Sequence, residues 1–162
     1  MSIIACLRKR RFLKRVYSYI KSRDYDKAVS ELNSLDEEKL DEDYYYALSL
    51  AYLAQGNTKE SMEAIDSAIE KDRGNPALIV HKAKILQRLK LYEESSSLLE
   101  SSKQLTLFNE EILYIQAINY LALNDPAHAN ELFYEALKTI DKRFVESRIA
   151  MAVELFLLKN RQ

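Results

Sequence analysis

The chain has 162 residues, of which 48% are hydrophobic and 30% are charged, and its formal net charge is −1. This balance supports a packed core and excludes global disorder. Two glycines and two prolines are too few for an architecture of many strands and turns, and the single cysteine, Cys6, excludes an intramolecular disulfide.

The first segment, residues 1–8, begins with apolar residues and continues into basic ones. A secretory signal has the opposite order and a longer apolar region, so we expect a protein that stays in the reducing cytoplasm. No apolar run reaches the roughly 20 residues that a membrane-spanning helix needs.

Charge is distributed unevenly along the chain. Residues 1–23 carry eight basic side chains and no acidic one, whereas residues 24–43 carry nine acids and two lysines. Three interpretations of the basic run stay open: a solvated helix face, pairing with residues 36–43 or with an acidic partner, and weak contact with an anionic membrane surface. The basic residues concerned are Arg8, Lys9, Arg10 and Arg11.

Short polar segments recur along the chain at a period of about 34 residues. Each contains or leads to a small residue, and these small residues are separated by 33, 34 and 34 positions: Ala28, Ser61, Ser95 and Ala129. Nine residues earlier stand Tyr19, Tyr52, Leu86 and Tyr120, and twelve residues earlier stand Val16, Ser49, Ala83 and Ala117. A fixed period of this length indicates a stack of similar supersecondary units.

These columns resemble the tetratricopeptide repeat (TPR), whose pattern places bulky, small and aromatic residues at set offsets. The resemblance implies an all-α fold: a right-handed superhelical stack of helix-turn-helix repeats, with small residues where two helices approach closely. It places four repeats within residues 9–143, and a capping helix at residues 144–162. The predicted repeats are 9–41, 42–75, 76–109 and 110–143.

The polar segments also predict how each second helix begins. We expect Asp24, Asn57 and Asn124 to cap these helices by accepting hydrogen bonds from backbone N–H groups. Pro126 suits a first turn, where no N–H donor is needed. In the third repeat Lys90 occupies the capping place, so a weaker cap is expected there.

The final helix is apolar nearly all round, because Leu155, Leu157 and Leu158 join the stripe that covers the fourth repeat. A terminal helix normally has a polar outer face. A homodimer through this helix is therefore one expectation.

Signatures of catalysis are missing from the sequence. His81 and His128 lie far apart without a nearby thiol, there is no phosphate-binding loop, and the acidic runs lack calcium-loop spacing. We expect no catalytic residue, cofactor or metal, and therefore no enzyme.

Binding of another protein is the better interpretation. In the TPR family the first helix of each repeat lines a concave groove, and the matching positions here are aromatic, aliphatic and basic. They are Lys14, Tyr17, Tyr46, Leu50, Leu53, Val80, His81, Lys84, Arg88, Tyr114 and Ile118.

The resemblance thus favours an adaptor or scaffold that holds a peptide segment or subunit of another protein in this groove. Two alternatives stay open: a dedicated chaperone for an exported or assembling partner, and an assembly factor at a membrane surface. Eleven tyrosines and a basic N-terminus invite comparison with nucleic-acid binding, but the slightly negative net charge argues against it.

Overall fold

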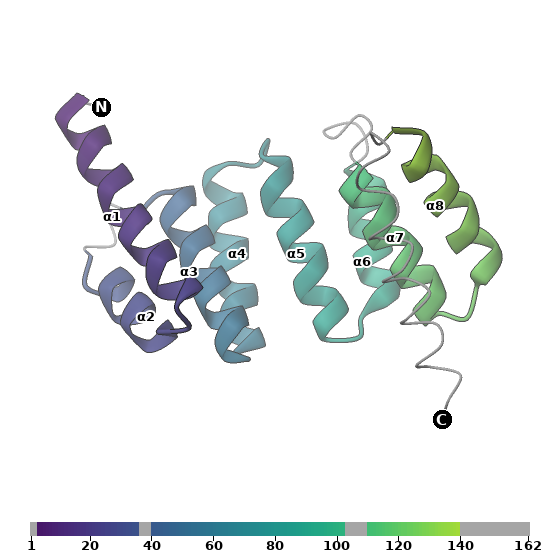
Figure 1. Ribbon diagram of the computed structural model, residues 1–162, viewed down its shortest axis with the longest axis horizontal. Helices are drawn as coiled ribbons and strands as arrows, with labels where there is room; N and C mark the ends of the chain where they lie inside the picture. The colour runs from purple at the N-terminus through teal and green to yellow at the C-terminus, as the bar shows by residue number, and fades with distance from the viewer. Residues whose placement is uncertain (1–2, 36–39, 103–109, 140–162) are drawn as a thin grey trace. The chain divides into compact units, whose positions relative to one another are not determined.

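The computed structural model describes residues 3–35, 40–102 and 110–139. The chain divides into two compact units, Met1–Ile85 and Leu86–Gln162, and each is described by itself. The described residues form eight α-helices and no strand, as expected for an all-α fold (Figure 1).

The first unit contains helix pairs with short connections. It holds α1 (Ile3–Lys21), α2 (Tyr25–Asn33), α3 (Glu42–Gln55), α4 (Thr58–Lys71) and most of α5 (Pro76–Arg88). Helices α1 and α2 pack together, as do α3 and α4, and α1 also packs on α3. The first helix of one repeat therefore lies against the first helix of the next.

The second unit contains α6 (Tyr92–Ser101), α7 (Glu110–Ala122) and α8 (Pro126–Thr139) after the last turn of α5. Helix α7 packs against both α6 and α8. Pro126 opens α8, and Pro76 opens α5, where the fixed φ and missing N–H of proline are compatible with a helix.

The repeated small and bulky columns form the core. Ala28, Ser61, Ser95 and Ala129 are each fully buried, and so are Val16, Ser49, Ala83 and Ala117. Small side chains at these places let two helix backbones approach closely. In the first unit, Val16, Leu32 and Ala47 belong to one apolar cluster, and Ile65, Leu78 and Ile85 to another.

The turn between the two helices of each pair has the same backbone conformation four times. One residue in each turn takes a positive φ: Arg23 (63°), Gly56 (88°), Lys90 (62°) and Asn124 (63°). The next residue donates its N–H to a carbonyl five positions back, on Tyr19, Tyr52, Leu86 and Tyr120 respectively, at 2.9–3.0 Å. This pairing is the Schellman motif that ends a helix, so the predicted period is also a period in backbone geometry.

Glycine in these turns is expected to stabilise the protein. Lys90→Gly and Arg23→Gly should each raise the free energy of unfolding by about 0.5–1 kcal/mol, because a side chain with a Cβ is strained in the left-handed region. The matched control is Gly56→Ala, which should lower it by about 1 kcal/mol. A Cβ at Gly56 meets no atom within 4 Å, so this loss reports conformation alone. Equal urea midpoints for wild type and both glycine variants would contradict this account.

The expected side-chain caps are wrong at three positions. Asp24 and Asn57 do precede α2 and α4, but neither makes a side-chain cap hydrogen bond. Asn124 takes the positive φ instead, and the following Asp125 accepts from the N–H of His128 through Oδ1 at 3.2 Å. The Schellman turn explains this shift, because it places the cap one residue after the left-handed position.

The described part of the N-terminal segment is helical. Helix α1 begins at Ile3 and continues without a break to Lys21, so it includes residues 3–8. The predicted capping helix at residues 144–162, with the homodimer expected through it, lies outside the described residues. Across the part of the chain that is described, no helix is both long and apolar enough to cross a membrane.

Candidate functional site

The predicted groove residues of the first two repeats are partly accessible. Lys14 is exposed on α1, and Tyr17, one turn later, is 37% exposed. Tyr46 and Leu50 are half-buried one turn apart on α3. Leu53 packs against the second apolar cluster, so it serves the core as well as any surface.

Tyr17 and Tyr46 lie close enough to affect each other electrostatically. Burial raises the pKa of Tyr17 to about 12, and Tyr46 and Asp43 add to this rise. Helix α1 packs on α3, which brings these two first helices side by side. The exposed Tyr17 and the half-buried Tyr46 therefore lie on neighbouring helices of the first unit.

His81 belongs to the core, which corrects its predicted place in the groove. Its side chain is 4% exposed, and its Nε2 lies 3.0 Å from the Oγ of Ser49. The hydroxyl oxygens of Ser49 and Ser61 lie 2.9 Å apart, and each hydroxyl donates to the other residue's backbone carbonyl at 2.8 Å. Tyr46 meets the imidazole edge-on with ring centroids 5.1 Å apart. Burial, and then the charge of Lys84, lower the pKa of His81 to about 4.

Val80 is also buried, with 4% of its surface exposed, so it too presents no side chain to a partner. Lys84 is half-buried, whereas Arg88 at the end of α5 is exposed. In the second unit, Tyr114 and Ile118 are half-buried one turn apart on α7, and Tyr114 contacts Phe133 with centroids 5.9 Å apart.

A second buried polar network was not predicted from the sequence. Asn119, fully buried on α7, donates through Nδ2 to the hydroxyls of Ser95 and Ser96 at 3.0 Å each. Its Oδ1 accepts from Nε2 of Gln87 at 2.7 Å, and the same nitrogen donates to the carbonyl of Ile115 at 3.1 Å. These bonds pair polar groups that lie buried in the second unit.

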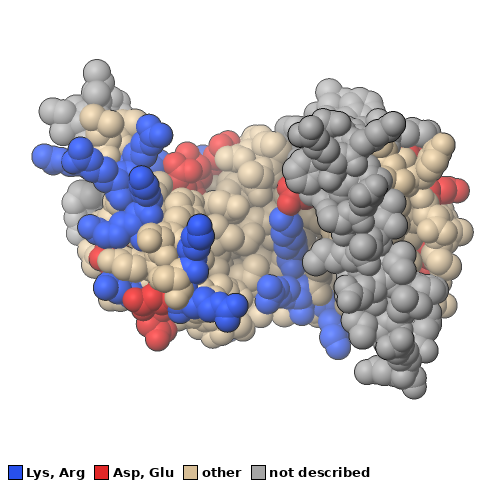
Figure 2. Space-filling view, viewed as in Figure 1, with Lys and Arg blue, Asp and Glu red and all other residues tan. Residues whose placement is uncertain are grey.

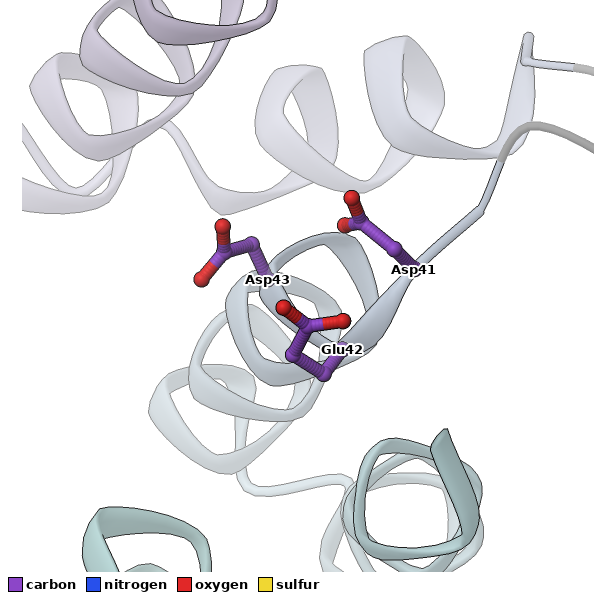
Figure 3. Close-up of side chains that lie close together, drawn as sticks. All are labelled: Asp41, Glu42 and Asp43. Carbon is purple, nitrogen blue, oxygen red and sulfur yellow. The ribbon is translucent and has the colours of Figure 1, made fainter. Parts of the chain in front are cut away.

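Three acidic side chains gather at the start of α3 (Figure 3). Carboxylate oxygens of Asp41, Glu42 and Asp43 lie within 4.8 Å of one another. Lys9 pairs with Asp41 and, at 2.6 Å, with Asp43. The N-terminal end of a helix favours negative charge, so the dipole of α3 and Lys9 together account for the cluster.

Lys9 shows that the basic N-terminus meets the acidic stretch of the same chain. Partial burial works against its charge, but the hydrogen bonds to Asp41 and Asp43 outweigh this and raise the pKa of Lys9 above its usual value. The intramolecular interpretation is therefore confirmed for Lys9. Arg8, Arg10 and Arg11 are exposed instead, and basic side chains gather over α1 at the left of Figure 2.

Comparison with curated proteins finds a relative that matches part of the chain. No family model matches the chain. It is 31% identical over 98 residues to a DnaJ homolog subfamily C member 7 homolog of Dictyostelium discoideum, a match that covers 60% of this chain and 18% of that protein. The chain thus spans less than one fifth of this curated relative.

Solved structures of TPR proteins match the chain over most of its length. A thermophilic TPR protein of Thermus thermophilus superposes with a TM-score of 0.76 and 17% identity, covering 88% of this chain and 79% of that one. YrrB, a TPR protein with an unusual peptide-binding site, superposes with a TM-score of 0.70 and 12% identity, covering 86% and 73%.

Proposed function

The chain has the tetratricopeptide-repeat fold, a fold of protein–protein interaction scaffolds, and from this premise we propose that it is a non-catalytic adaptor for a peptide segment of another protein. The pair Tyr17, which is exposed, and Tyr46, which is half-buried, carries the proposal. Tyrosine supplies a large contact area with a polar tip, and it is enriched where proteins bind each other.

The surface around the pair fits an extended or helical peptide with an apolar anchor. Leu50 lies one turn beyond Tyr46 on α3, and the exposed Lys14 lies one turn before Tyr17 on α1. An apolar side chain of the peptide would pack between the tyrosines and Leu50, and an acidic group beside it would meet Lys14. The likeness to YrrB, described as having a peptide-binding site, supports this class of partner.

Selection from a random peptide library on the wild-type protein tests the proposal. We expect the Tyr46→Ala/Leu50→Ala variant to bind the selected peptides about tenfold more weakly or worse, because apolar anchors dominate such interfaces. Isothermal titration calorimetry measures the dissociation constants. Since Tyr46 also contacts His81, Tyr17→Ala is the second variant, and circular dichroism checks that both remain helical.

The matched control is Tyr134→Ala on α8, which removes a tyrosine that is 62% exposed and lies in the second unit. It should leave the dissociation constants unchanged. If folded Tyr17→Ala and Tyr46→Ala/Leu50→Ala proteins bind every selected peptide as tightly as wild type, the proposed surface is wrong.

A further inference from the structure

We propose that the outward face of α1 binds membrane surfaces that carry anionic lipid, through a basic row formed by Arg10, Arg11, Lys14 and Lys21. This inference goes beyond the peptide surface and does not depend on it, although the two surfaces share Lys14 and Tyr17. The row lies on α1, whereas Tyr46 and Leu50 lie on α3.

Helical spacing places the four residues of the basic row on one face. Arg10 and Lys14 are four positions apart, Arg11 and Lys14 are three apart, and Lys21 follows Lys14 by seven, so all return to the same side of a helix with 3.6 residues per turn. All four are exposed. The opposite face is the core face, where Leu13 is 9% exposed and Val16 is fully buried.

The described acidic groups near α1 pair with basic residues outside the basic row. Lys9 is held by Asp41 and Asp43, and Arg15 donates to Glu31 through Nε at 2.9 Å. Among the residues that the structure describes, no ion pair involves a member of the row. Its four charges stand along roughly 16 Å of helix, at 1.5 Å per residue.

Apolar and aromatic groups accompany the charges. Leu7 is 52% exposed, and it lies three and four positions before Arg10 and Arg11, so it continues the same face. Tyr17 is 37% exposed and lies three positions after Lys14. Leucine beside basic residues is typical of a helix that lies on a membrane, and tyrosine prefers the boundary between water and hydrocarbon.

A lipid surface fits this face better than an acidic peptide does. The row follows one helix, and basic side chains gather over α1 at the left of Figure 2. A broad anionic surface can contact all four charges and Leu7 at once. A peptide would need side chains on neighbouring helices to enclose it, whereas the basic row lies along one helix.

Flotation with phosphatidylcholine vesicles, with and without phosphatidylserine, tests the proposal on the full chain. We expect binding only to vesicles with phosphatidylserine, and we expect it to weaken as salt is added. The Arg10→Ala/Arg11→Ala/Lys21→Ala variant should bind about 100-fold more weakly, since each basic residue near such a surface contributes about fivefold. Lys14 stays in place because the proposed peptide surface also uses it.

The matched control is Lys59→Ala/Lys71→Ala/Arg73→Ala, which removes three exposed basic residues of the same unit and changes the net charge equally. It should bind the vesicles like wild type, as should the Tyr46→Ala/Leu50→Ala variant. Absence of binding to phosphatidylserine vesicles, or equal loss in both triple variants, would overturn the proposal. So would tighter binding of the row to a polyglutamate peptide than to the vesicles.

Discussion

Replacing Asn119 with leucine is expected to lower the free energy of unfolding by about 3 kcal/mol, through lost hydrogen bonds rather than lost volume. The Asn119 amide accepts from Gln87 and donates to Ser95 and Ser96. Leucine has a similar size but can make none of these hydrogen bonds. Both serines are buried, so their hydroxyls lose a partner where water does not replace it.

The measurement is urea denaturation followed by circular dichroism, with hydrogen exchange to locate the change. In a repeat protein each unit is stabilised by its neighbours, so exchange should accelerate in α6 and α7 and stay unchanged in α1 to α4. Asn130→Leu on α8 is the matched control, because Asn130 is exposed. A loss of stability no greater in Asn119→Leu than in Asn130→Leu would contradict the importance of this network.

Acidification is expected to remove about 3 kcal/mol of stability through His81, between its ordinary pKa of 6.5 and its folded value of about 4. The folded protein keeps the imidazole neutral because it is buried beside Lys84. As the pH falls below about 6.5, His81 binds a proton in the unfolded chain but not in the folded chain. The equilibrium therefore shifts toward unfolding. The stabilising contribution of His81 is fully present above about pH 6.5.

Urea denaturation at several pH values, with wild type and His81→Gln, isolates this effect. Glutamine can still hydrogen-bond to Ser49 but does not titrate, so the difference in stability between the two proteins should shrink as the pH falls. His128→Gln is the control of opposite sign, because a hydrogen bond to Asp125 raises the pKa of the exposed His128. A wild-type advantage over His81→Gln that is constant with pH would contradict the prediction.

The repeat fold could be predicted from the sequence because its columns have a direct physical role. The carbonyls that accept the turn hydrogen bonds belong to Tyr19, Tyr52, Leu86 and Tyr120. The small residues lie buried where helices approach closely. The side-chain caps could not be predicted from residue type alone. Whether Asp24 or Asp125 caps a helix depends on backbone angles that the identity of the residue does not determine.

The predicted site was less accurate where a polar residue occupies a core column. His81 stands 34 positions from both Ala47 and Ile115, which are buried, so its column indicated burial although its imidazole suggested a surface role. Asn119 stands 34 positions after the buried Ile85, and the same comparison would have placed it in the core. Which polar partners such residues find depends on packing between helices, which a period in sequence does not specify.

The hydrogen bonds that join Ser49 to Ser61 and His81 hold three helices in the observed axial register. Small and aliphatic columns alone allow one helix to slide along another by a turn, about 5.4 Å, because similar side chains then meet again. In this shifted stack the two hydroxyls and the imidazole would be buried without their partners, at an energetic cost for each. The serines and the histidine therefore favour the observed alignment of α3, α4 and α5.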